Sequence, residues 1–213
     1  MQIYIDTADS QAISHYLSTG IFSGVTCNPV ILRDGGYSPA TAHEFYRLCQ
    51  DAGAEEIFLQ SFGHSVQEIV DQGLRYRDYG PEIVVKVVST TNGAAAASKL
   101  AEQGVPVLLT AAHHAKQAVV ALAAGATYFA PYLSEMNRAS RYGHDEISTM
   151  HQILNAPGSH TKLVLAGLDN VAEIVRYAQE GIHYMTLTPD IAQTLLEDSF
   201  TTDMEVMFNG VSL

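Results

Sequence analysis

The stretch PEIVVKVVST, residues 81–90, places a single lysine, Lys86, inside an apolar run. Lysine is among the residues least often buried, because its charged head is costly to take out of water. Side chains alternate along a strand, so Lys86 shares one face with Val84 and Val88, and the other apolar residues form the second face. If that second face packs on helices, Lys86 points into a partly dry interior that favours the neutral amine. A neutral amine attacks ketone carbonyls and forms a Schiff base.

Other polar side chains stand where further short apolar runs end. In chain order these positions are Asp6, Thr26, Asn28, Gln60, Thr110, Tyr132 and Thr188, and the run at 162–166 leads into Gly167. Asp6 and Tyr132 are candidates for moving the protons that Schiff-base chemistry requires. The sequence contains no His, Cys, Asp and Glu cluster with metal-ligand spacing and no evident Ser-His-Asp set. We therefore expect neither a metal nor a cofactor.

Each of these side chains also has a purely structural interpretation. Lys86 could be a structural lysine with its head in water or in a salt bridge. Asp6 could cap the first helix, although Thr7 or Asp9 could do so equally well. Tyr132 could be a core tyrosine, and Asn28 with the proline after it could form a turn. Their joint occurrence at matching positions favours a functional interpretation.

Short strands separated by alanine- and leucine-rich helices must position these groups. We expect strands at 2–6, 23–26, 57–60, 83–87, 106–110, 128–132, 162–166 and 184–187, and helices such as 93–103 and 115–125. Gly104, Gly125 and Gly181 each stand where a helix would end. Eight strands alternating with eight helices predict an α/β fold, a (β/α)8 TIM barrel, whose catalytic groups follow the strands. The alternative is an open doubly wound sheet, but no G-x-G-x-x-G follows any strand.

The chain of 213 residues is expected to form one barrel domain, residues 1–213, with 199–213 as a C-terminal helical tail. That tail is expected to pack on its own barrel or on a neighbour. The formal net charge of −12 argues against nucleic-acid binding and against anionic membranes. Cys27 and Cys49 suggest neither a disulfide framework nor a zinc site. Because no signal peptide or membrane-length apolar run is evident, we expect a cytoplasmic protein.

Several segments resemble the transaldolase family, most closely its fructose-6-phosphate aldolase branch. They are YIDTAD (4–9), GVTCNPVIL (24–32), IVVKV (83–87), LLTAA (108–112) and APY (130–132). The resemblance runs in order from residue 1 to about residue 197, and the TxNP step at 26–29 together with the lysine strand is its specific part. It implies a class I aldolase that needs no metal. It also implies a homo-oligomer, a pentamer or a decamer, built with the C-terminal segment.

The resemblance implies a role for each matching residue around the nucleophile. Lys86 would form the Schiff base with the substrate ketone. Asp6 would orient substrate hydroxyls and shuttle a proton. Asn28 would hydrogen-bond a hydroxyl of the donor, with Thr26 beside it.

The resemblance also implies how protons move near the new bond. Tyr132 would be the acid/base, acting through a water held by Gln60 and Thr110. Transaldolases proper place a glutamate at position 60, and a carboxamide can orient a water but cannot take its proton. Gln60 therefore favours reversible aldol cleavage and addition over three-carbon transfer between sugar phosphates.

The phosphate site of the family is altered in this sequence. Glu135 stands where an arginine is expected three residues after the tyrosine, and Gly167 stands where a serine is expected. A carboxylate would repel a phosphate. In the loop 134–145, Arg138 could fold back, so we include Arg138 and Gly167 among the substrate-binding candidates. The AAHH step at 111–114 also departs from the family and places His113 and His114 near the mouth, where solvated loop residues are expected.

Three functions follow from these observations. The first is reversible aldol chemistry between a small hydroxyketone, of the dihydroxyacetone or hydroxyacetone type, and an aldehyde or sugar acceptor. The second is transaldolase activity, in which a dihydroxyacetone unit moves between sugar phosphates. The third is a divergent sugar-binding barrel, or an oligomeric scaffold, without aldol turnover.

Overall fold

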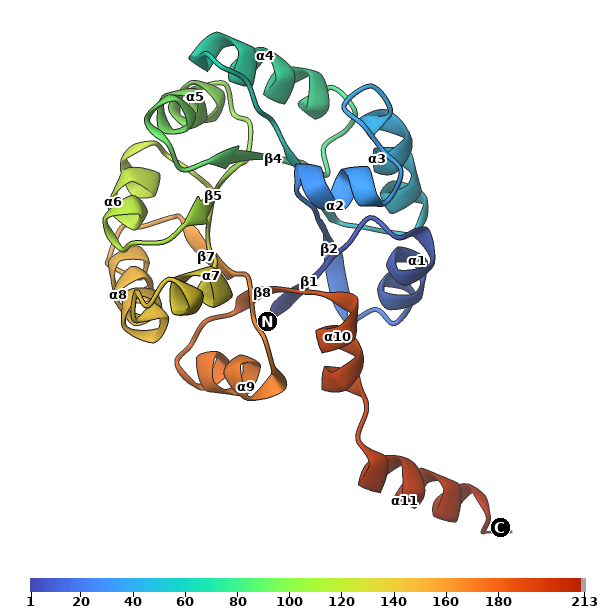
Figure 1. The fold of residues 1–213 in the computed structure, drawn as a ribbon. Helices are drawn as coiled ribbons and strands as arrows, with labels where there is room; N and C mark the ends of the chain where they lie inside the picture. Colours follow the sequence, from blue (N-terminus) through green and yellow to red (C-terminus); the bar gives the residue numbers. More distant parts are fainter. Residues whose placement is uncertain (212–213) are drawn as a thin grey trace.

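The computed structural model describes residues 1–211 and forms a closed barrel of eight parallel strands (Figure 1). The strands are β1 (Gln2–Asp6), β2 (Phe22–Thr26), β3 (Glu56–Gln60), β4 (Ile83–Val88), β5 (Val107–Ala112), β6 (Tyr128–Pro131), β7 (Lys162–Leu165) and β8 (Tyr184–Leu187). Each strand pairs with the next in sequence, and β8 pairs with β1. This last pairing closes the sheet, so the predicted (β/α)8 barrel is confirmed and the open sheet is wrong.

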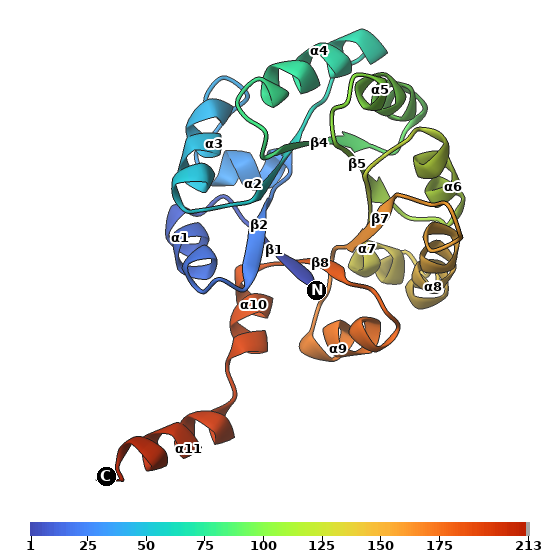
Figure 2. The same cartoon turned by 180° about the vertical axis from the view of Figure 1, so that it is seen from behind.

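Helices surround the barrel on its outside (Figures 1 and 2). Those following strands are α1 (Ser10–Ser18), α3 (Ala42–Asp51), α4 (Val66–Arg77), α5 (Thr91–Glu102), α6 (Lys116–Ala123), α8 (Gly143–Leu154), α9 (Val171–Gln179) and α10 (Pro189–Leu196). Three more helices occur within residues 1–211, namely α2 (Pro29–Asp34), α7 (Leu133–Arg138) and α11 (Ser199–Asn209). The interpretation of 134–145 as a loop was therefore wrong. A helix of six residues is too short to produce a recognisable 3.6-residue period.

The buried side chains of the strands form two layers, one inside the barrel and one between the sheet and the helices. The inner cluster consists of Tyr4, Phe58, Val84, Leu108, Tyr128, Ala130 and Val164. The alternate residues of β4, Ile83, Val85 and Val87, belong instead to the core between sheet and helices. The predicted division of β4 into two faces is confirmed, and it places the Lys86 side chain on the inner face with Val84.

Polar aromatic groups fill the amino-terminal end of the barrel. The Glu56 carboxylate accepts hydrogen bonds from the Tyr4 and Tyr128 hydroxyls, each at 2.5 Å. Burial raises the pKa of both phenols far above their usual value, so both stay protonated and donate. The Lys162 ammonium lies 4.9 Å from the Tyr184 ring centroid. These contacts stabilise the amino-terminal end of the barrel. Catalytic groups of such barrels lie at the other end, where the strands have their carboxyl ends.

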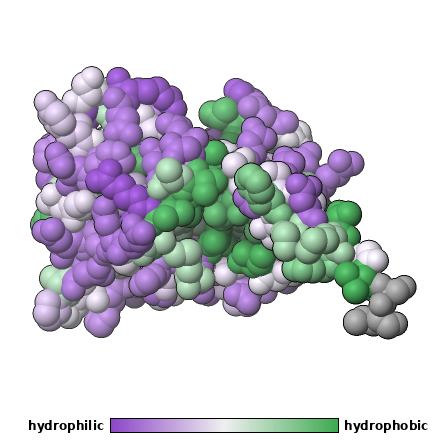
Figure 3. Space-filling model, turned by 90° about the horizontal axis from the view of Figure 1, so that it is seen from below, coloured by the Kyte–Doolittle hydropathy of each residue, from purple (hydrophilic) through white to green (hydrophobic). Residues whose placement is uncertain are grey.

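The last helix, α11, projects away from the barrel (Figures 1 and 2). Asp198 caps it by accepting a hydrogen bond from Thr201 N at 2.9 Å, and none of its side chains is buried. The helical tail is confirmed over 199–209, but packing on its own barrel is wrong, and residues 212–213 lie outside the described residues. Figure 3 shows apolar surface on the projecting segment and on the body beside it. Over residues 1–211, no helix has the length and apolarity needed to cross a membrane.

Candidate active site

Lys86 lies on β4 inside the barrel, with only 5 % of its surface exposed. Its Nζ donates a hydrogen bond to the backbone carbonyl of Cys27, just beyond β2, at 2.7 Å. The ion pairs within residues 1–211 do not include Lys86, so the salt-bridge interpretation is wrong. The carbonyl partner fixes the position of the amine inside the barrel.

Asp6, at the end of β1, faces the same interior through a chain of hydroxyls. Thr26 Oγ1 donates to Asp6 Oδ1 at 2.6 Å and lies 2.6 Å from Thr186 Oγ1. Because the Thr26 proton is used on Asp6, Thr186 is the donor to Thr26. Asp9, not Asp6, caps α1, accepting from Ala12 N at 2.7 Å. The capping interpretation of Asp6 is therefore wrong, and its carboxylate is free for the site.

Burial raises the pKa of Asp6 above its usual value, although the charge of Lys86 and the hydrogen bond from Thr26 act in the opposite direction. The folded protein thus holds this proton more tightly than the unfolded chain does. Stability is therefore lost as the pH rises from the unfolded pKa, about 3.9, through the raised folded value.

We expect Asp6→Asn to unfold at higher urea concentration than the parent protein at pH 8, because the neutral amide removes the penalty for a buried charge. This advantage should disappear below about pH 4, where Asp6 is protonated in both states. Asp9→Asn is the matched control, since Asn caps a helix as well as Asp and should leave the midpoint unchanged. A lower midpoint for Asp6→Asn at pH 8 would contradict the sign of this shift.

Tyr132 follows β6 and forms a bridge to Ala166 just beyond β7. Its phenol oxygen accepts a hydrogen bond from Thr110 Oγ1 of β5 at 3.2 Å. Gln60, at the end of β3, is the register partner of Lys86 on β4. A carboxamide, an amine, a hydroxyl and a phenol thus lie on or directly after four consecutive strands, β3 to β6. The sequence predicted this placement, and the roles of these groups stay predictions.

Asn28 begins helix α2 instead of forming a simple turn. Its Oδ1 accepts hydrogen bonds from Val30 N at 2.9 Å and Ile31 N at 3.0 Å, and Pro29 occupies the first helical position. Its carboxamide oxygen is therefore used by the helix, which leaves the NH2 group as the part that can donate to a ligand. The role of Asn28 in donor binding stays a prediction.

Two hollows border the mouth on the β1 to β3 side. One of about 410 Å³ is lined by Asp6, Asp9, Asp34 and Tyr37 among others. A smaller one of about 140 Å³ is lined by Cys27, Asn28, Gln60 and Phe62 among others. Lys86 lines neither of them, but Asp6 lines the first and Cys27 lines the second. Within residues 1–211, no group of three or more His, Cys, Asp and Glu side chains is placed to hold a metal ion.

Residues 3–210 match the family model described as transaldolase/fructose-6-phosphate aldolase. The chain belongs to this family. A probable transaldolase of Nitrosopumilus maritimus (strain SCM1) is 28% identical, and the match covers 94% of this chain and 90% of that protein. A probable transaldolase of Geobacillus thermodenitrificans (strain NG80-2) is 27% identical, covering 94% and 93%.

Solved structures with low sequence identity share the barrel. A thiamine phosphate pyrophosphorylase of Pyrococcus furiosus superimposes with a TM-score of 0.62 at 13% identity, covering 91% of this chain and 92% of that chain. An inosine 5′-monophosphate dehydrogenase of Legionella pneumophila gives 0.64 at 11% identity, covering 90% and 58%. At such identities the likeness concerns the fold alone.

The backbone explains why position 167 is a glycine and not the serine that the resemblance led us to expect. Gly167 has φ +68°, a left-handed conformation that side chains rarely adopt. A Cβ there would lie 2.8 Å from Ser134 Oγ, so a serine would be both strained and crowded. The backbone carbonyl of Gly167 accepts from Ser134 N at 2.9 Å. The glycine thus closes α7 against β7 without a side chain that could hold a phosphate.

Arg138 does not join the residues at the strand ends. Its Nη1 donates to Glu135 Oε1 at 2.7 Å on the outer part of α7, and its side chain is 66% exposed. The two opposite charges neutralise each other one helical turn apart. The expectation that Arg138 folds back into the site is wrong, because its side chain pairs with Glu135 on the same helix.

The sequence interpretation missed two features of the site. Thr186 of β8 joins the hydroxyl chain to Asp6, and the alternation of β8 would have indicated its inward side chain. The Cys27 carbonyl, the partner of Lys86, is a backbone atom without a sequence signal. Burial raises the pKa of the Cys27 thiol to about 12, which fits its predicted role as an unreactive filler.

Proposed function

We propose that this protein is a class I Schiff-base aldolase that catalyses reversible aldol cleavage and addition. The donor would be a small hydroxyketone of the dihydroxyacetone or hydroxyacetone type, and the acceptor an aldehyde. The observation that carries the proposal is Lys86, buried on the inner face of β4 with its amine held by the Cys27 carbonyl. Family membership supports the same chemistry.

In the addition direction, Lys86 Nζ attacks the ketone carbon of the donor and forms a C–N bond. The ketone oxygen takes up two protons and leaves as water, which produces the iminium. Loss of a proton from the neighbouring carbon yields an enamine, whose carbon attacks the aldehyde carbon. The aldehyde oxygen takes a proton, and hydrolysis then returns the lysine amine and releases the product.

Tyr132 is placed for the proton step at the new bond. Thr110 donates to its phenol oxygen, so the phenolic proton is directed away from Thr110 and is available to a substrate oxygen. In the cleavage direction the same oxygen would accept the proton of the substrate hydroxyl. Gln60 would hold a water between the phenol and the reacting carbon, as the family resemblance implies.

Asp6 and its hydroxyl chain supply the donor side of the proposed site. Burial raises the pKa of Asp6 above its usual value, which favours a carboxyl group that can hold and return a proton during the reaction. Thr26 and Thr186 fix its orientation. The Asn28 NH2 group would complete the contacts to the donor hydroxyls.

Two other functions fit part of the observations. Transaldolase activity fits the shared family, but the carboxamide of Gln60 cannot take the proton that a glutamate would take there. A sugar-binding barrel without turnover is motivated by Glu135 and Gly167, which remove two groups of the family's phosphate site.

Reductive trapping tests the proposal. The protein is incubated with dihydroxyacetone and sodium borohydride, and its intact mass and modified peptide are measured. We expect a mass gain equal to the donor minus water plus two hydrogens, on the peptide that contains Lys86. Glyceraldehyde added with dihydroxyacetone should yield a ketose. An adduct without ketose supports the sugar-binding alternative, and no adduct overturns the aldolase.

We further propose that the protein assembles with copies of itself, as a pentamer or a decamer, through α11. The exposed fractions of Phe200 and Phe208 are 81% and 60%, and such apolar faces usually mark an interaction site. We expect the double substitution of both phenylalanines by glutamate to lower the molar mass in light scattering. Val119→Glu, at an exposed valine of α6, should leave the mass unchanged. A parent protein that runs as a monomer contradicts this proposal.

A further inference from the structure

The chain turns sharply where β5 ends. Ala111 has φ +55°, which is unfavourable for a residue with a side chain and persists only where the surroundings hold it. The register between β5 and β6 shifts between Leu109 and Ala112. This distortion redirects the two histidines that follow, His113 and His114.

Gln117 fixes the position of both histidines. Its Oε1 accepts hydrogen bonds from His113 N at 2.8 Å and from His114 N at 3.1 Å. Its Nε2 donates to the carbonyl of Ser89, three residues after Lys86. The loop after β5 is thereby tied to the end of the strand that carries the nucleophile.

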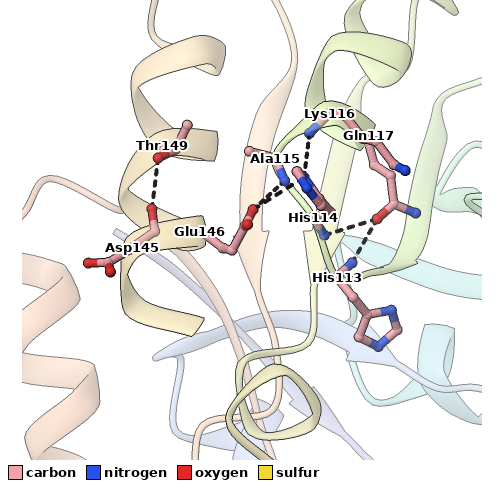
Figure 4. A network of polar contacts seen from close by, with 8 residues as sticks. All are labelled: His113, His114, Ala115, Lys116, Gln117, Asp145, Glu146 and Thr149. Carbon is pink, nitrogen blue, oxygen red and sulfur yellow. Dashed lines mark hydrogen bonds and ion pairs between the residues drawn. The ribbon is translucent and has the colours of Figure 1, made fainter. Parts of the chain in front are cut away.

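The two rings then diverge, as Figure 4 shows. His114 turns toward α8, where its Nδ1 lies 3.6 Å from Glu146 Oε2, and its side chain is 51% exposed. The His113 ring points away from this network. It is half-buried and stands edge-on to the Tyr132 ring, with 6.0 Å between centroids and an angle of 80°. The expectation of solvated loop residues therefore fits His114 and not His113.

His113 lies on the side of the mouth opposite the donor groups. In an eight-stranded ring β2, which carries Thr26, is opposite β6, which leads to Tyr132. Beyond Tyr132, the same side contains Gly167, whose positive φ and close approach to Ser134 leave no room for a side chain that could hold a phosphate. If the donor is held by Asp6, Thr26 and Asn28 as proposed, the acceptor would approach the enamine from this side, past the imidazole of His113.

We propose that His113 contacts the acceptor and selects an unphosphorylated hydroxyaldehyde, a specificity that rests on the proposed aldolase function. A neutral imidazole offers one donor and one acceptor, which match the two roles of a hydroxyl group. Among residues 133–138 of α7 the cationic side chain is Arg138, and its charge is already paired with Glu135 instead of being free for a phosphate. A site that hydrogen-bonds a substrate hydroxyl discriminates strongly against analogues that lack it, because its own polar group is then left unpaired.

The test compares two aldehydes, glyceraldehyde and propanal, with dihydroxyacetone as donor. His113→Phe keeps an aromatic edge against Tyr132 and removes both ring nitrogens. We expect it to lower kcat/KM for glyceraldehyde by about tenfold or more, mainly through KM, and to change the value for propanal less than about twofold. His113→Asn should recover part of the loss. His114→Phe is the matched control and should leave both values unchanged.

Three outcomes overturn this inference while leaving the aldolase intact. Equal losses for both aldehydes would assign His113 a structural role, and no loss for glyceraldehyde would remove any role. A parent protein that prefers glyceraldehyde 3-phosphate would also overturn it. Borohydride trapping of dihydroxyacetone on Lys86 is measured in each variant. If the parent protein forms no adduct, the proposed function itself has failed and the inference fails with it.

Discussion

Replacing Lys86 by methionine is expected to abolish the borohydride-trapped adduct and to lower kcat/KM for the aldol reaction on the order of 10⁴-fold or more, the scale on which loss of a covalent nucleophile acts. Methionine is unbranched and apolar, so it suits a position that is 5% exposed beside Val84. The Cys27 carbonyl loses a donor, which costs about 1 kcal/mol. We therefore expect a folded barrel without an electron sink, measured by trapping mass and by initial rates.

Lys162→Met provides the matched control for this experiment. The chain has four lysines, and Lys162 lies at the opposite end of the barrel, with its ammonium against the rings of Tyr128 and Tyr184. Its replacement should leave both the adduct and the rate unchanged. An adduct that survives in Lys86→Met, or that maps to another lysine, would contradict the assignment of the nucleophile.

Strand alternation made the orientation of Lys86 predictable. A six-residue strand with valines on both sides has only two faces, and only one can pack on helices. The eight strands were located to within one or two residues for the same reason. The short helices α2 and α7 were not predicted, because fewer than two turns leave no periodic signal.

Side-chain competition limited the prediction of the site. Asp6 and Asp9 both precede α1, and only the geometry shows that Asp9 caps it. Arg138 was expected near the substrate, but an acidic residue three positions earlier on a helix takes it. Both choices depend on distances that neighbouring residue types do not specify.

Backbone conformation was the second factor that limited the prediction of the site from the sequence. The left-handed Ala111 directs His113 toward Tyr132, and alanine carries no sequence signal for that conformation. Gly167 was noted as a missing serine, whereas the structure gives the cause, a positive φ and the close approach of Ser134. The proposed acceptor side of the mouth is thus determined by two backbone turns, while the proposed donor side follows from strand alternation.

Tyr132→Phe is expected to lower kcat by about 10²- to 10⁴-fold, the usual contribution of a positioned general acid or base. The phenyl ring keeps the edge contact with His113, and only the hydroxyl that accepts from Thr110 is lost. Because Lys86 and Asp6 stay in place, trapping of dihydroxyacetone should persist. The variant would then form the Schiff base and fail at the carbon–carbon step, which single-turnover kinetics with preformed adduct would measure.

Thr110→Val is the control that separates the phenol's chemistry from its placement. It removes the donor to the phenol oxygen and keeps the buried volume, so we expect a loss of less than about tenfold. Full activity in Tyr132→Phe would exclude the phenol as the acid/base. Loss of trapping would instead place Tyr132 in Schiff-base formation, before any acceptor is bound. If Tyr132 acts only after the adduct has formed, Asp6, on the opposite side of the mouth, is the remaining candidate for moving protons on the donor ketone.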